Sequence, residues 1–134
     1  MNYIIADPDT QSSIELKNIL DGYAHLDFQG SYTTLGAAEN GSLEHTPDIA
    51  FIRLGKAELN AFRLAGEFRE RSPRSKVIFI SSQRETAVDA FEHEADGFLL
   101  IPFDKRAVGR LLRNIGIERT DMLPQKLSRK RTGG

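Results

Sequence analysis

The sequence predicts an α/β domain built on a doubly wound sheet of five parallel strands. Short apolar runs alternate along the chain with segments whose apolar residues have helical spacing, which is typical of βαβ units. Residues 49–52 and 77–80 are continuously hydrophobic, as strands buried on both faces of a parallel sheet are. Right-handed crossovers then place helices on both faces of the sheet.

The first strand and helix are predicted near the N-terminus. Residues 3–6 form a short apolar strand. Asp9 or Thr10 can accept hydrogen bonds from the first turn of the following helix, so each is a candidate N-cap. The apolar residues that keep helical spacing there are Leu16, Ile19, Leu20 and Tyr23.

The next three elements differ in the strength of their signals. A second, weaker strand covers residues 26–32. Residues 35–43 form a poor helix, because Gly36 and Gly41 interrupt it. The third strand is strongly apolar and ends at Arg53.

The second half of the chain continues the alternation. We expect helices over residues 57–71 and 85–94 and from Asp104 onward, with strands over 76–81 and 97–101. The side chains expected to face inward are Leu59, Phe62, Ala65 and Phe68 in the first of these helices, Val88 and Phe91 in the second, and Val108, Leu111, Leu112 and Ile115 in the third.

Composition indicates a globular protein. The chain has 134 residues, 40% of them hydrophobic and 28% charged, which is enough for one domain with a single core. The absence of cysteine excludes disulfides and cysteine-ligated metal sites. Because no apolar run approaches membrane-spanning length and no basic leader precedes the first strand, we expect a cytoplasmic protein without membrane contact.

Charge divides the chain into a domain over residues 1–117 and a basic linker or tail over residues 118–134. The first part carries 13 Lys and Arg against 17 Asp and Glu, a net charge of −4. The second carries 5 against 2, a net charge of +3. We interpret the tail as a linker leading to an output domain, and a nucleic-acid contact is the alternative. Its basic residues are Arg119, Lys126, Arg129, Lys130 and Arg131.

Several motifs, in this order and at these intervals, give the chain a recognisable pattern. Asp7 follows the first strand, Pro47-Asp48 precedes the third, Ser81 ends the fourth, and residues 95–103 read Ala-Asp-Gly-Phe-Leu-Leu-Ile-Pro-Phe. Over roughly residues 1–116 the chain resembles response-regulator receiver (CheY-like) domains. The resemblance implies a flavodoxin-like (βα)5 fold with strand order 2-1-3-4-5 and a role in two-component signal transduction.

The chemistry of the family is missing from the positions that would carry it. A working receiver has two adjacent acids after the first strand, which hold Mg²⁺, and here Asp7 is followed by Pro8 and then Asp9. The position of the phosphorylated aspartate is Arg53, and Ile101 replaces the family's lysine. The resemblance therefore implies a degenerate phosphoacceptor pocket in a pseudo-receiver that lacks the phospho-acceptor aspartate, with no metal and no cofactor.

Two residues match the switch of the family. Ser81 matches the hydroxyl residue that responds to phosphorylation, and Phe98 matches the aromatic residue whose rotamer reports activation. The alternative is that both are ordinary strand residues. Ile101-Pro102 matches a peptide bond that is often cis in receivers.

Arg53 itself has two interpretations. In the first, its guanidinium lies among Asp7, Asp9 and Ser81 as a permanent cation in place of Mg²⁺ and fixes the loops in one state. In the second, it extends to solvent. We favour the first, because an arginine near the crevice without a partner is costly to bury.

Receivers commonly dimerise through the face made by the fourth helix, fifth strand and fifth helix, so the resemblance implies a homodimer. Acidic residues on one helix and basic residues on the other can pair across a two-fold axis. A solvated charged face is the alternative. The residues expected on this face are Arg84, Asp89, Glu92, His93, Lys105, Arg106, Arg110 and Arg113.

Three functions remain open. The first, which we favour, is a phosphorylation-independent receiver that regulates transcription through an attached DNA-binding output domain, so that DNA is contacted only through that domain. The second is a stand-alone protein-interaction module, and the third is a sensor that binds an anionic small ligand with Arg53. An enzyme is not expected, because His25, His45 and His93 lie in unrelated segments and no nucleophile or phosphate-loop motif is present.

Overall fold

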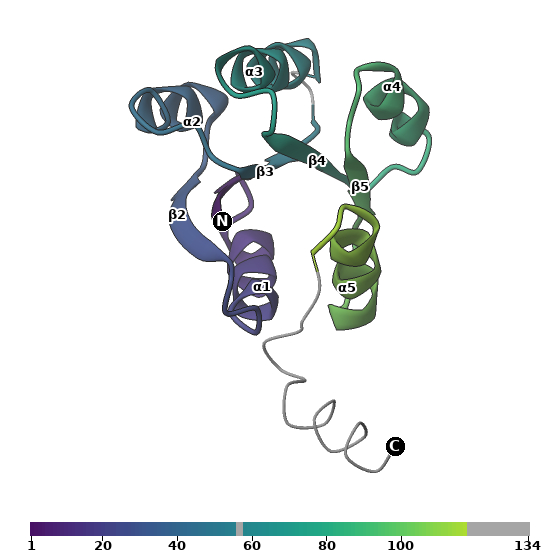
Figure 1. The fold of residues 1–134 in the computed structure, drawn as a ribbon. Helices are drawn as coiled ribbons and strands as arrows, with labels where there is room; N and C mark the ends of the chain where they lie inside the picture. Colours follow the sequence, from purple (N-terminus) through teal and green to yellow (C-terminus); the bar gives the residue numbers. More distant parts are fainter. Residues whose placement is uncertain (56–57, 118–134) are drawn as a thin grey trace.

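Five parallel strands form a single sheet in the order β2-β1-β3-β4-β5 (Figure 1). The structure is a computed structural model that describes residues 1–55 and 58–117. The order confirms the predicted doubly wound, flavodoxin-like fold. The strands are β1 (Asn2–Ala6), β2 (Asp27–Tyr32), β3 (Ile49–Arg53), β4 (Lys76–Ser81) and β5 (Gly97–Leu100).

In the described part of the chain, five helices cover the two faces of the sheet. In Figure 1, α1 and α5 lie below the sheet, and α2, α3 and α4 lie above it. This arrangement follows from the right-handed crossovers between neighbouring parallel strands. The helices are α1 (Thr10–Leu20), α2 (Leu35–Gly41), α3 (Glu58–Arg71), α4 (Thr86–Glu92) and α5 (Lys105–Asn114).

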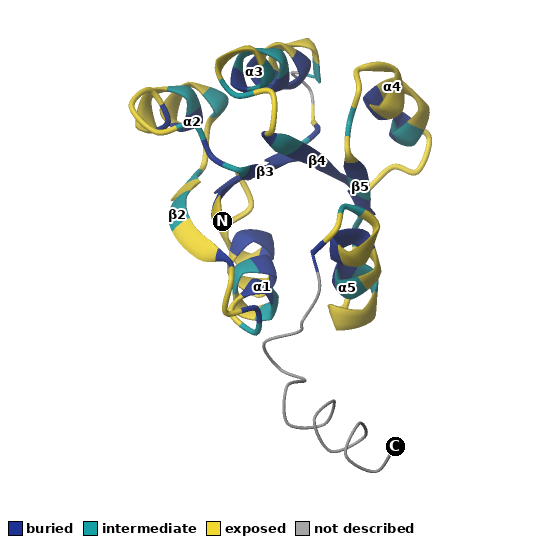
Figure 2. Ribbon diagram, viewed as in Figure 1, coloured by how far each residue is buried: buried dark blue, intermediate teal, exposed yellow. Residues whose placement is uncertain are grey.

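The sheet separates two hydrophobic cores. Because side chains alternate along a strand, Tyr3 and Ile5 pack in the core shared with α1 and α5, whereas Ile4 and Ala6 pack in the core shared with α2 and α3. The central strands β3 and β4 are buried on both faces, while β2 at the edge has only exposed and half-buried residues (Figure 2). The continuous apolar runs and the weak second strand of the sequence are explained by these positions.

Aspartate side chains close the ends of several elements. Asp9 accepts hydrogen bonds from the first turn of α1, and Asp104 does so for α5. At the starts of the strands, the Asp48 carboxylate accepts the Asn2 N–H at 2.8 Å, and the Asp96 carboxylate accepts an N–H of β4 at 2.8 Å. The predicted N-cap at Asp9 is confirmed.

The inward faces of α3 and α4 were predicted incorrectly at three positions. Leu59, Val88 and Phe91 are 78%, 65% and 53% exposed. In α3, residues spaced by three drift about 60° around the helix at each step, so Leu59 leaves the face that Phe68 occupies. In the seven-residue α4, Thr86 and the alanine one turn later take the inner face, which turns Val88 and Phe91 outward.

Element ends differ slightly from the prediction. α4 is shorter than residues 85–94, β5 ends one residue before Ile101, and Tyr23 lies beyond the end of α1 although it is buried in the α1/α5 core. The predicted start of α3 at Ala57 and the basic tail over residues 118–134 lie outside the described residues. In the described part of the chain, no helix has the length and apolar character needed to cross a membrane.

Candidate functional site

Asp7 and Arg53 meet at the carboxyl ends of the neighbouring strands β1 and β3. Asp7 follows β1 directly, Arg53 is the last residue of β3, and these strands are neighbours with Ala6 paired to Ile52. Strand alternation points both side chains toward the α1 side of the sheet. In doubly wound sheets this edge is where ligands bind.

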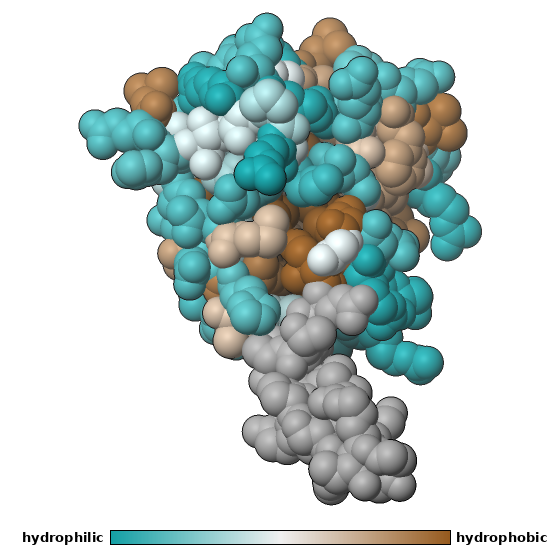
Figure 3. Space-filling view, viewed as in Figure 1, coloured by the Kyte–Doolittle hydropathy of each residue, from teal (hydrophilic) through white to brown (hydrophobic). Residues whose placement is uncertain are grey.

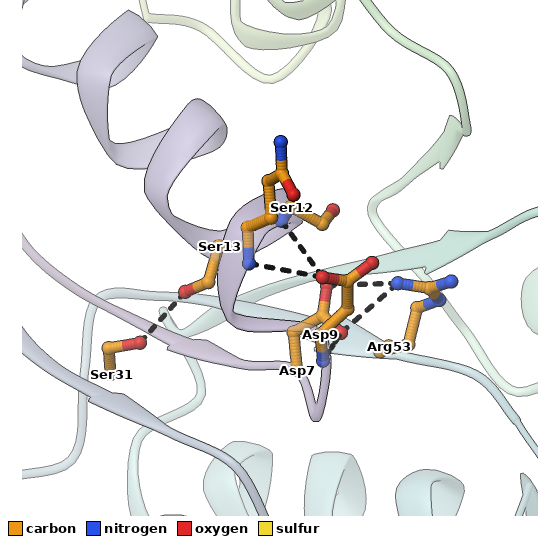
Figure 4. Close-up of polar contacts among 7 residues, drawn as sticks. Asp7, Asp9, Ser12, Ser13, Ser31 and Arg53 are labelled. Carbon is orange, nitrogen blue, oxygen red and sulfur yellow. Dashed lines mark hydrogen bonds and ion pairs between the residues drawn. The ribbon is translucent and has the colours of Figure 1, made fainter.

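The two side chains form an ion pair with two contacts (Figure 4). Nη1 of Arg53 donates to both carboxylate oxygens of Asp7, each at 3.1 Å. The Asp9 backbone N–H donates to the Oδ1 atom of Asp7 at 2.9 Å. The Asp7 side chain is 0% exposed and that of Arg53 is 20% exposed, so the pair is nearly removed from solvent. At this burial, removal of either partner leaves an uncompensated charge.

The ion pair favours the first interpretation of Arg53, a cation held in the crevice, but among the described residues its only ion-pair partner is Asp7. The Asp9 carboxylate caps α1 by accepting the backbone N–H groups of Gln11 and Ser12 at 3.0 and 3.3 Å. Within the described residues, no hydrogen bond or ion pair joins Arg53 to Asp9 or to Ser81. The expected three-sided site is therefore a two-residue contact.

The donor set at this crevice does not fit Mg²⁺. Both oxygens of Asp7 already accept hydrogen bonds from the Arg53 guanidinium, and the neighbouring position is Pro8, which has no ligand atom in its side chain. Mg²⁺ requires several oxygen ligands in octahedral geometry. Among the residues that the structure describes, no group of three or more His, Cys, Asp or Glu side chains could hold a metal ion.

The position of the family's lysine is apolar. Ile101 is half-buried and packs against the α1/α5 core, where its side chain has no charge to offer the crevice. The Ile101–Pro102 peptide bond is cis, as the resemblance led us to expect.

Ser81 and Phe98 lie on the neighbouring strands β4 and β5, but their side chains contact different parts of the protein. The Ser81 hydroxyl accepts the Gln83 backbone N–H at 3.0 Å and lies 3.3 Å from the Gln83 carbonyl oxygen, so it closes a local turn of the β4–α4 loop. Phe98 is half-buried against the core shared with α2 and α3. Coupling between the two residues stays a prediction.

A small pocket of about 150 Å³ lies beside the ion pair. An anionic ligand bound through Arg53 would have to compete with the buried Asp7 carboxylate, which already neutralises the guanidinium. This competition makes the anion-sensor hypothesis less favourable. The lining residues are Ala6, Asp7, Pro8, Thr33, Thr34, Leu35, Arg53 and Gly55.

The surface formed by α4, β5 and α5 has an apolar groove between charged borders. The groove has a volume of about 530 Å³ and is lined by Phe91, Phe98 and Leu100 among others. Hydrophobic side chains gather over α4 in the space-filling view (Figure 3). All eight residues that were predicted on this face are exposed, but the ring of His93 stacks on Phe62 of α3. That contact was not foreseen, and no sequence signal indicates it.

The comparisons with known proteins agree with this fold. No protein-family model matches the chain. The chain is 21% identical over 126 residues to the sensory transduction protein LytT of Bacillus anthracis, covering 94% of this chain and 51% of that protein. It is 26% identical over 117 residues to the sensory transduction protein LytR of Streptococcus mutans, covering 86% and 48%. The crystal structure of the response regulatory domain of MrkE from Klebsiella pneumoniae superposes with a TM-score of 0.75 at 22% identity, covering 86% of this chain and 94% of that one.

Sequence relatives and fold together indicate a response-regulator receiver (CheY-like) domain. The chain spans about half the length of the curated relatives it matches.

Proposed function

We propose that this chain is an atypical receiver domain of two-component signalling that works without phosphorylation. It acts through protein contacts, and it controls an attached DNA-binding output domain through the linker over residues 118–134. Support for the output domain comes from the relatives, which are about twice as long as the matched region and are named sensory transduction proteins.

The single observation that carries the proposal is the buried ion pair. Arg53 occupies the acceptor position, and its guanidinium uses the carboxylate that a Mg²⁺ ion would need. A phosphoryl group would therefore meet no acceptor aspartate at position 53, and it would have to compete with Asp7 for the guanidinium. The ion pair joins the ends of β1 and β3, and we propose that it holds the loops after these strands in one arrangement without a phosphoryl group.

Phosphorylation of designed variants tests this proposal. Arg53→Asp alone should accept no phosphoryl group from acetyl phosphate with Mg²⁺, because Pro8 and Ile101 still leave the metal and phosphate without ligands. The triple variant Pro8→Asp, Arg53→Asp, Ile101→Lys restores the three missing roles and should be phosphorylated. Intact-mass spectrometry measures the adduct. Phosphorylation of the wild type or of the single variant would refute this view of the crevice.

The partner that we propose for the groove between α4 and α5 is a second copy of the chain. Phe91 of α4 and Arg110 of α5 line the groove. α4 also carries the exposed acids Asp89 and Glu92, and α5 also carries the exposed base Arg113. A two-fold axis through the groove brings the acids of α4 in one copy against the bases of α5 in the other.

Charge reversal tests the dimer. Asp89→Lys and Arg110→Glu should each weaken self-association measured by sedimentation, and the double variant should recover it. Arg74→Glu, on the exposed segment before β4, is the matched control. A monomer at high micromolar concentration, or equal effects of Arg74→Glu and Arg110→Glu, would count against this dimer.

A further inference from the structure

Helix α4 makes few contacts with the rest of the domain along its length. It has seven residues, and only Thr86 and Ala90 are buried. Its outer side carries Val88 and Phe91, both largely exposed. A helix this short, with one turn of buried side chains, gains little from packing and needs other contacts to hold one position.

Contacts of this kind join the C-terminal end of α4 to helix α3. The imidazole of His93 lies flat on the ring of Phe62, with centroids 3.9 Å apart and an interplanar angle of 5°. One residue further on, the carbonyl oxygen of Glu94 accepts a hydrogen bond from Nη2 of Arg69 at 2.6 Å. Glu94 has a φ of 64°, in the left-handed region, so the chain turns sharply away from the helix here.

The stack is anchored in the core of the protein. Phe62 is buried and meets Phe79 of β4 edge to face, with centroids 5.2 Å apart and an interplanar angle of 89°. Three rings therefore run in a row from the central sheet, through α3, to the end of α4. Aromatic rings that meet edge to face, as Phe62 and Phe79 do, attract beyond the area that they bury.

The imidazole is also oriented from its own helix. The Nδ1 atom of His93 lies 2.9 Å from the carbonyl oxygen of Asp89. A carbonyl oxygen can only accept, so Nδ1 carries the proton. This hydrogen bond fixes the plane of the imidazole, and the fixed plane is what permits face-to-face stacking on Phe62.

We infer that the Phe79–Phe62–His93 ring stack, together with the Arg69–Glu94 hydrogen bond, is a clasp that sets the position of α4. The clasp is a positioning device: it determines where Val88 and Phe91 stand on the surface that borders the groove. The clasp itself does not depend on the proposed function; only the role of that surface in binding a partner rests on it. α3 begins at Glu58, so the clasp connects α4 to the helix that follows the ion pair in the chain.

Hydrogen exchange of the full chain tests the clasp. His93→Ala removes the stack from an exposed position, so the fold should survive, and the amides of α4 should exchange about fivefold faster. His93→Phe keeps a flat ring but loses the Nδ1 hydrogen bond that orients it, so it should restore the wild-type rate only in part. His45→Ala, an exposed histidine in the loop before β3, is the matched control and should change nothing in α4. Amides of β1 and β3 should exchange at the wild-type rate in all three variants.

Two results would overturn the inference. One is an α4 exchange rate in His93→Ala equal to those of the wild type and His45→Ala. The other is equal acceleration in α4 and in the central strands, which would indicate general destabilisation. Exchange is measured at a low concentration at which the chain is monomeric, so neither readout depends on self-association or on phosphorylation. The clasp can then fail while the proposed function stands, and the reverse.

Discussion

Removal of the Arg53 guanidinium should destabilise the fold strongly, although Arg53 lies at the rim of the sheet. In Arg53→Met the aliphatic stem is preserved and the charge is lost. Among the residues that the structure describes, the Asp7 carboxylate, which is 0% exposed, then keeps only the Asp9 N–H as a hydrogen-bond partner. Breaking a buried pair from one side costs 3–5 kcal/mol, and because Arg53 is 20% exposed we expect the lower end, about 3 kcal/mol.

The reverse change should cost less. In Asp7→Asn the guanidinium loses its counter-ion, but it is close enough to solvent to rotate outward, so we expect a loss of about 1 kcal/mol. The double variant Arg53→Met, Asp7→Asn has neither charged group, so no unpaired charge is left. A double-mutant cycle should therefore give a coupling energy of about 2 kcal/mol between the two positions.

Urea denaturation followed by far-ultraviolet circular dichroism measures these values, since the chain has no tryptophan. Arg63→Met is the matched control, because Arg63 pairs with Glu67 at 2.7 Å on the exposed surface of α3. An exposed pair of this kind contributes about 0.3–0.5 kcal/mol. If Arg53→Met lowers the free energy of unfolding no more than Arg63→Met does, the reasoning about the buried pair is refuted.

Two further predictions concern the fold. Burial, with a smaller contribution from Asp21, raises the pKa of Tyr3 to about 12. The folded state therefore disfavours the ionised phenol, and the stability that is present below about pH 10 is lost as the pH rises toward the pKa of the folded state. Tyr3→Phe should therefore lose less stability than the wild type between about pH 9 and about pH 11 in urea denaturation, and parallel losses would contradict the assignment. Asp96→Ala leaves the Val77 N–H without its acceptor and should cost about 1 kcal/mol, whereas Asp96→Asn keeps an acceptor oxygen and should cost less; equal losses in the two variants would argue against this role.

The sheet and the central contact of the site could be predicted because both depend on local patterns in strands. Continuous apolar runs identified β3 and β4, and the strict alternation of side chains placed Asp7 and Arg53 on the same side of adjacent strands. An arginine and an aspartate so placed have a strong reason to pair, since either alone would be buried without a partner.

The contacts of the helices could not be predicted in the same way. Either of two faces of the seven-residue helix α4 could pack against the domain. The face with the small residues Thr86 and Ala90 is buried, and the face with Val88 and Phe91 is exposed. The stack of His93 on Phe62 joins residues of different helices, so no spacing within one segment can reveal it.

The local bond of Ser81 shows another limit. A hydroxyl at the end of a strand can bond either to groups in the crevice or to the backbone of its own loop. The Ser81 hydroxyl bonds to the Gln83 backbone, in its own loop. A motif match identifies the position of such a residue but not its hydrogen bond.

The central claim, that this receiver fold operates without a phosphoryl group, is tested most directly by titrating the ¹⁵N-labelled chain with Mg²⁺ and beryllofluoride, an analogue of the aspartyl phosphate. The buried ion pair predicts that the amide resonances of Asp7, Arg53, Ser81 and α4 keep their positions throughout the titration. Saturable shifts at these residues, spreading into α4, would show a working acceptor site and contradict the claim.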